Sequence, residues 1–223
     1  MSERFEKKAS GSHPFESDIS SLGRYLYTGE ESSTSASLAN ARQSQLVFDG
    51  VLSLGGHSLL DVGCGDGTYT WELAERFPVA VTGIDPASNA IEVAKKLKSS
   101  SSPALSVDFI AGDLESTVRA MGKRFDIAVV RGVLHHVENP ASLIRQLAQC
   151  SDSVVIIEPN GLNPILKAIE KMSPYHRKHM ERSFAPWRVR IWLESAGWKI
   201  NVHRVGGIVP FFFPKRLAVL LRA

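Results

Sequence analysis

A turn with glycine at every second position points most directly to chemistry. The turn, Gly63–Gly67, follows the run Leu59–Val62 and precedes a helix-like segment, Thr70–Phe77. Glycine adopts positive φ and lets a ligand approach the main chain closely. The first turn of a helix adds unpaired N–H groups. A strand, a glycine turn and a helix in this order predict a cradle for a nucleotide cofactor at the carboxyl edge of a parallel sheet.

The composition of this turn argues against a dinucleotide. The dinucleotide fingerprint is G-x-G-x-x-G, whereas the third glycine here, Gly67, arrives one residue early. Asp61 and Asp66 also bring two carboxylates to the place of a diphosphate, and like charges so close repel each other. A cofactor with an ammonium group in its tail is favoured instead. S-adenosylmethionine has that ammonium, together with a ribose and an adenine.

Four segments in order carry a resemblance to a known family. Leu59–Gly67 resembles the first motif of the Rossmann-like (class I) S-adenosylmethionine-dependent methyltransferases of small-molecule type. Val79–Asp85 is similar to their second strand with its ribose-binding acid, about twenty residues beyond the glycines. Ala111–Leu114 is similar to the adenine-contacting segment, and Phe125–Val137 to the fourth strand with its active-site loop. Val154–Glu158 looks like the fifth strand, and the resemblance spans residues 43–205.

The resemblance implies a cofactor site. Asp85 would accept hydrogen bonds from the ribose hydroxyls and Asp113 from the adenine amino group, with Leu114 packed on the ring. A simple turn carboxylate is the alternative for each of these two acids. Arg131 would line the cofactor through its main chain. The expected cofactor residues are Asp61, Gly63, Cys64, Gly65, Asp85, Pro86, Asp113, Leu114 and Arg131, and the product would be S-adenosylhomocysteine.

His135 and His136 are the candidate catalytic residues. They follow the fourth predicted strand, at the sheet edge where ligands bind. A histidine with its ordinary pKa of about 6.5 can take up a proton at neutral pH. Packing or a structural hydrogen bond is the alternative for each ring. Related methyltransferases often carry Glu-His at this pair, where the acid helps to bind a metal. Histidine in place of that glutamate disfavours metal assistance, and we assign no metal ligand.

The acceptor is expected beneath a lid. By resemblance, the insertion at about 159–182 and the N-terminal arm cover it. Glu158 ends the fifth strand and is a candidate to orient an acceptor hydroxyl or amine. A solvated helix face is the alternative for the charged residues of the insertion. The expected substrate residues are Tyr25, Glu158, Asn160, Tyr175, His176 and His179.

Strands that alternate with helices predict an α/β fold, a doubly wound and mostly parallel sheet of the seven-strand type with helices on both faces. We expect a mobile arm at 1–38, with a short ordered piece at Leu22–Tyr27, and a methyltransferase domain at 39–223. Ala39–Leu54 is expected to be a helix and Trp198–Val205 the sixth strand. Leu217–Leu221 is either a shortened antiparallel strand or a docked helix.

Helix ends and faces are also predicted. Asn139-Pro140 reads as the N-cap and first residue of a helix that runs to Cys150. Apolar residues at helical spacing predict two one-sided helices, the second closed by Gly197. Their apolar residues are Ala87, Ala90, Ile91, Ala94 and Leu97, and Val189, Trp192, Leu193 and Ala196.

Composition limits the remaining possibilities. The 223 residues are 43% hydrophobic, and no apolar run approaches the roughly 18 residues that cross a bilayer. No secretory signal is visible, and two distant cysteines favour a reduced, cytoplasmic setting. A net charge of +3, mostly dispersed, gives no reason to expect nucleic-acid binding. The apolar run Gly207–Pro214 fits core, an acceptor channel or contact with a membrane surface. The sequence does not indicate an oligomeric state.

The function expected from the sequence is methyl transfer from S-adenosylmethionine to an oxygen or nitrogen of a small molecule. A hydrophobic or lipid-like acceptor is one option. The alternatives are a methyltransferase for RNA or protein, a non-catalytic cofactor-binding scaffold and an NAD-type dehydrogenase. The displaced third glycine and Asp61 argue against the dehydrogenase.

Overall fold

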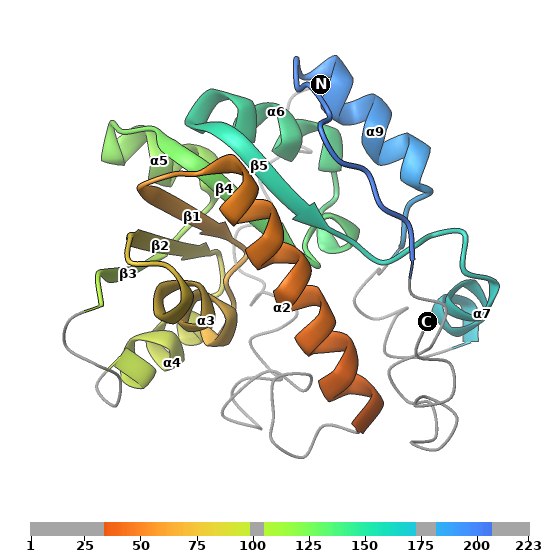
Figure 1. Ribbon diagram of the computed structural model, residues 1–223, viewed down its shortest axis with the longest axis horizontal. Helices are drawn as coiled ribbons and strands as arrows, with labels where there is room; N and C mark the ends of the chain where they lie inside the picture. Colours follow the sequence, from red (N-terminus) through yellow and green to blue (C-terminus); the bar gives the residue numbers. More distant parts are fainter. Residues whose placement is uncertain (1–33, 99–104, 173–181, 207–223) are drawn as a thin grey trace, which may run out of the picture.

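A parallel sheet forms the centre of the molecule. The computed structural model describes residues 34–98, 105–172 and 182–206. Within them, five strands lie in the order β3-β2-β1-β4-β5, and every neighbouring pair is parallel (Figure 1). The strands are β1 (Ser58–Val62), β2 (Ala80–Asp85), β3 (Val107–Ala111), β4 (Phe125–Arg131) and β5 (Ser151–Ile157).

Helices cover both faces of this sheet. One face carries α2 (Thr34–Leu54), α3 (Thr68–Arg76) and α4 (Ser88–Lys98). The other carries α5 (Leu114–Met121), α6 (Pro140–Cys150) and α9 (Pro186–Ser195). A short 3-10 turn, η1, covers Leu134–His136, and α7 (Pro164–Met172) follows β5. The predicted α/β architecture with a parallel sheet between two helical layers is confirmed.

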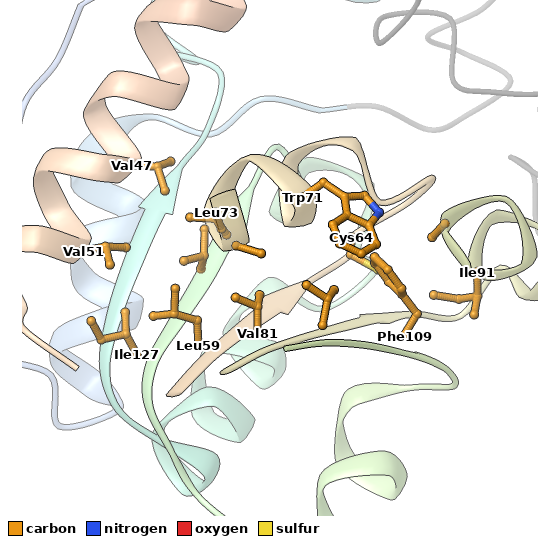
Figure 2. Close-up of a cluster of buried hydrophobic side chains, with 14 residues drawn as sticks. Val47, Val51, Leu59, Cys64, Trp71, Leu73, Val81, Ile91, Phe109 and Ile127 are labelled. Atoms are coloured by element: carbon orange, nitrogen blue, oxygen red, sulfur yellow. The ribbon is translucent and has the colours of Figure 1, made fainter. Parts of the chain in front are cut away.

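Alternation along the strands explains why both faces are covered. Successive side chains of a strand point to opposite faces, so Leu59 joins the core beneath α2 and α3 whereas Leu60 joins the core beneath α6. Figure 2 shows the first core, where Val47 and Val51 of α2 lie over β5 and β4, and Trp71 of α3 lies beside Phe109. A strand buried on both faces reads as a nearly continuous apolar run.

The strand order reverses between β1 and β4. The chain therefore leaves the carboxyl ends of these two strands in opposite directions, which opens a crevice between the loops that follow them. The loop after β1 is the glycine turn, and the loop after β4 contains the two histidines. The topology thus brings both candidate chemical segments to one place.

The predicted helix ends and faces agree with the structure. Asn139 caps α6 by accepting a hydrogen bond from the Ser142 N–H, and Pro140 is its first residue. Gly197 follows α9 with φ +88°. The alanines and Ile91 predicted to face inward at α4 are buried, although Leu97 at its far end is 40% exposed.

One prediction near the C-terminus is wrong, because Trp198–Val205 is not a strand. The described residues contain five strands, and the seven-strand type stays a prediction. The apolar alternation of Trp198–Val205 does not bury a face, because both Val202 and Val205 are more than half exposed. Helix α2 begins at Thr34, so the last residues of the expected arm are helical; this polar start carries no apolar spacing that could have marked it.

Other predictions fall outside the described residues. They concern Leu22–Tyr27, Gly207–Pro214 and Leu217–Leu221. Within the part that the structure describes, no helix combines the length and the apolar character needed to cross a bilayer.

Candidate active site

The glycine turn has the conformation that its sequence predicts. Gly63, Gly65 and Gly67 have φ of +71°, +56° and +81°, a left-handed region that disfavours other residues. A Cβ added at Gly63 would also lie 2.6 Å from a methyl group of Val133 in the histidine loop. The turn therefore packs directly against the loop that follows β4.

Asp85 holds this turn from the end of β2. Its Oδ2 accepts a hydrogen bond from the Gly65 N–H at 2.9 Å, and its Oδ1 accepts one from the Ala87 N–H at 2.8 Å. Each carboxylate oxygen can accept a second bond. Asp85 also lines the cleft at the carboxyl edge of the sheet. It can thus shape the turn and accept hydrogen bonds from a ligand at the same time.

Asp113 is the N-cap of α5. Its side chain accepts hydrogen bonds from the Ser116 N–H at 2.9 Å and from the Ser116 hydroxyl. These bonds hold the pKa of Asp113 below its ordinary value. The capping role agrees with the turn-carboxylate alternative, and contact with an adenine remains a prediction. Leu114, the next residue, is buried.

Asp61 is a buried carboxylate beside a buried cation. Only 4% of Asp61 is exposed, and its Oδ2 accepts a hydrogen bond from the Thr70 hydroxyl at 2.6 Å. Burial raises the pKa of Asp61 to about 6, while the Thr70 bond and the charge of Arg131 oppose that rise. Asp61 lines a small cavity beneath α2 rather than the large cleft.

The Arg131 side chain joins α2 to α3. Its guanidinium lies 3.5 Å from the centre of the Tyr69 ring and donates to the Ser44 hydroxyl at 2.9 Å and to the Asn40 carbonyl at 3.0 Å. A carboxylate oxygen of Glu72 lies 3.7 Å away. The sequence suggested a role only for the main chain of Arg131, so the contacts of its side chain were not predicted.

His135 and Glu158 form a pair at the ends of β4 and β5. His135 Nδ1 lies 2.8 Å from Glu158 Oε2, and the two side chains are 13% and 8% exposed. The other oxygen, Glu158 Oε1, accepts hydrogen bonds from the Val133 and Leu134 N–H groups, each at 2.7 Å. Glu158 therefore fixes both the histidine loop and the orientation of the His135 ring.

His136 lies against His135. The ring centroids are 3.9 Å apart and the planes meet at 44°. The predicted role of His136 as a base stays a prediction, and His135 has the better-defined geometry.

The large cleft brings most of the predicted site together. Asn160 reaches it after β5 and accepts a hydrogen bond from the Leu162 N–H. Tyr25, Tyr175, His176 and His179 lie outside the described residues. The predicted residues that line the cleft are Gly63, Cys64, Gly65, Asp85, Pro86, Asp113, Leu114, Arg131, His135, His136, Glu158 and Asn160.

Three features of this site were not predicted from the sequence. Asn40 and Gln43 of α2 line the cleft, but polar residues on a helix give no signal that separates them from solvated ones. The pairing of Glu158 with His135 was also missed, although both were candidates. The apolar strand that ends at Arg131 could have flagged its side chain, because a charge rarely follows such a run without a partner.

Comparison with known proteins agrees with this geometry. The methyltransferase domain family matches residues 59–153, from β1 to the start of β5. The ubiquinone biosynthesis O-methyltransferase of Methylobacterium sp. (strain 4-46) is 38% identical over 109 residues, 49% of this chain and 40% of that protein. The enzyme of the same name from Pseudoalteromonas translucida (strain TAC 125) is 30% identical over 152 residues, 64% of this chain and 63% of that protein. This chain spans less than two thirds of the length of either relative.

Solved structures show the same fold. Magnesium protoporphyrin IX methyltransferase from Synechocystis PCC 6803, with bound SAH, has a TM-score of 0.69 and 21% identity, covering 89% of this chain and 92% of that one. The family match, the relatives and the glycine turn at the strand reversal lead to one assignment. These findings support the resemblance of this chain to the class I S-adenosylmethionine-dependent methyltransferases.

Proposed function

We propose that this protein transfers a methyl group from S-adenosylmethionine to an oxygen of a small-molecule acceptor, with His135 as general base. One observation carries the proposal. The His135–Glu158 pair, with Nδ1 and Oε2 2.8 Å apart, lies on the same cleft as the glycine turn and Asp85. A base and a cofactor cradle that share one cleft can serve a single reaction.

The residues of the cradle fit this cofactor. Asp85 is a carboxylate that lines the cleft, and carboxylate oxygens are suited to accept hydrogen bonds from ribose hydroxyls. The carboxylates Asp61 and Asp66 favour a cationic tail and oppose a diphosphate. When bound, the cofactor supplies a methyl group already activated by its sulfonium. The protein's task is then to hold the acceptor oxygen in line with that methyl, which can lower the barrier by about 7–11 kcal/mol.

The His135–Glu158 contact sets the tautomer of the base. A carboxylate that already accepts two main-chain N–H bonds is an acceptor, so Nδ1 of His135 carries the proton. Nε2 therefore keeps its lone pair and can take the proton of an acceptor hydroxyl as the oxygen attacks. Glu158 then stabilises the imidazolium. General base catalysis of this kind contributes about a hundredfold to ten-thousandfold.

Two observations support the class of acceptor. A base is needed where the attacking atom keeps its proton until attack, as a hydroxyl does, and the relatives reported above are O-methyltransferases by name. The residues that line the cleft include the apolar side chains Leu166, Val189 and Leu193. We infer a hydroxylated acceptor with a hydrophobic body.

The insertion at about 159–182 is proposed as the cover of this acceptor. Lys167 of α7 donates to the Ser183 carbonyl at 2.7 Å, and Glu170 accepts from the Ser183 N–H at 2.8 Å. The Arg182 N–H then bonds to the His135 carbonyl. These contacts fasten the described end of the insertion beside the proposed base.

The test is incubation of the protein with methyl-labelled S-adenosylmethionine and a metabolite extract, followed by identification of the labelled product. A methyl ether that forms with the wild type and is lost with His135→Ala is expected. His57→Ala is the matched control, because His57 is exposed at the opposite edge of the sheet. A labelled amine or nucleic acid, or equal turnover in both variants, would contradict the proposal.

A further inference from the structure

Asp61 and Arg131 meet on one face of neighbouring strands. Asp61 of β1 stands beside Val129 of β4 in the register of the sheet. Arg131 lies two residues further along β4, so its side chain points to the same face as Val129. Both side chains line the small cavity beneath α2, and 8% of the Arg131 side chain is exposed.

The surroundings of Asp61 are mostly acidic or neutral. Thr70 donates a hydrogen bond to it, and Asp85 adds a second negative charge from β2. Arg131 of β4 supplies positive charge. The other titratable or polar groups that face this site are Tyr69 and Glu72 from α3, Ser44 from α2, and Cys64 and Asp66 from the glycine turn.

Contacts hold the cation in place. The Tyr69 ring stacks below the guanidinium while the Ser44 hydroxyl and the Asn40 carbonyl accept its hydrogen bonds. A charge fixed in a poorly hydrated site acts strongly on its neighbours, since the interaction is weakly screened. Arg131 therefore acts on Asp61 without having to move.

We propose that Arg131 is a positioning residue which keeps Asp61 ionised beneath the glycine turn, and that the ionised Asp61 attracts the cationic tail of the cofactor. This inference rests on the proposed function. It assigns to Arg131 an electrostatic role in cofactor binding besides its packing between α2 and α3.

Because Asp61 is buried, its charge depends on pH near 6. The pKa of Asp61 lies at about 6 with Arg131 in place, because the charge of Arg131 opposes the effect of burial. Removal of that charge raises the pKa of Asp61 further, because the effect of burial is then less opposed. The negative charge beneath the turn would then be lost at a pH where the wild type still has it.

The experiment compares Arg131→Met with Arg131→Lys. Affinity for S-adenosylhomocysteine, which keeps the ammonium, is measured by calorimetry from pH 6 to pH 8. If the midpoint of Asp61 rises by one unit in Arg131→Met, affinity falls about fivefold relative to wild type at pH 6 and stays within about twofold at pH 8. Arg131→Lys keeps the charge and should follow the wild-type profile.

Each outcome decides between an electrostatic and a packing role. A loss of affinity in Arg131→Met that is equal at every pH, or an equal loss in Arg131→Lys, would overturn the proposal. Asp61→Asn should bind weakly with no pH dependence of its own. If Arg131→Met does not fold, the pH profiles of S-adenosylhomocysteine affinity are compared between the wild type and Asp61→Asn. Parallel profiles would then refute the inference. A wild type that binds no S-adenosylhomocysteine at any pH would instead refute the proposed function.

Discussion

Glu158→Gln isolates the catalytic contribution of one carboxylate. The amide has nearly the same shape, and its oxygen can still accept the Val133 and Leu134 N–H bonds. Its NH₂ group then faces His135 Nδ1, where a carboxylate oxygen stood at 2.8 Å. A donor at that place requires Nδ1 to become the acceptor, so the proton moves to Nε2 and the base loses its lone pair.

The size of the effect follows from this tautomer change. Loss of general base catalysis should lower kcat by about a hundredfold or more. Affinity for S-adenosylhomocysteine should change little, because the proposed reaction uses Glu158 toward the acceptor and not toward the cofactor. Glu158→Ala is different, since it strands two main-chain donors at a cost of about 1–3 kcal/mol each when buried. That variant should unfold at clearly lower urea concentration, whereas Glu158→Gln should not.

Single-turnover methyl transfer at saturating cofactor provides the assay, with calorimetry for binding and urea unfolding for stability. We expect the Glu158→Gln variant to fold, to bind S-adenosylhomocysteine and to fail in methyl transfer. A Gln variant with wild-type kcat would show that positioning alone accounts for catalysis. A variant with poor cofactor binding would show that Glu158 acts through the fold of the β4 loop.

Three further changes test the cradle. Asp85→Asn replaces one acceptor oxygen by a donor NH₂ group and should weaken S-adenosylhomocysteine binding about 10–100-fold. This range corresponds to the loss of about 1.5–3 kcal/mol that is typical of hydrogen bonds to a charged group. Unchanged affinity in calorimetry would remove Asp85 from the site. Gly63→Ala should lower the free energy of unfolding, measured in urea, by about 1–3 kcal/mol, because of the φ of +71° and the close contact with Val133. Gly55→Ala is the control and should lower it less, because φ is +63° but the space around the added Cβ is open. Burial raises the pKa of Asp61 in the folded protein from 3.8 to about 6. The contribution of Asp61 to the free energy of unfolding is therefore favourable at low pH and is lost as pH rises through 6, by up to about 3 kcal/mol. Asp61→Asn should remove that dependence, and parallel stability profiles for the variant and the wild type would speak against it.

Local patterns were enough to predict the sheet and the glycine turn. The strands that end at Val62, Asp85 and Arg131 are apolar because both their faces are buried, and the positive φ values are tied to glycine itself. Such features are properties of a short segment. The same reasoning failed at Trp198–Val205, because alternation becomes a strand only where a neighbouring strand or a core receives it.

Contacts between distant segments could not be predicted in this way. The bond between His135 and Glu158 depends on the register of β4 and β5, which places Arg131 beside Ile157 and so brings the two following loops together. The position of the Arg131 side chain depends on how α2 docks over the sheet. The candidate residues could be named from the sequence, but their partners could not.

The buried carboxylate Asp61 lowers the stability of the fold, and its proposed role in cofactor binding would account for that cost. A neutral side chain in its place would avoid the roughly 3 kcal/mol that separates a pKa of about 6 from the ordinary value. The site instead keeps an acid there and fixes Arg131 beside it. Groups with strongly perturbed pKa values are typical of functional sites, and Asp61 lies two residues before the glycine turn that lines the cleft. A buried acid with a fixed counter-charge, directly beneath a turn shaped for a ligand, is best explained by a cationic ligand on the other side of that turn.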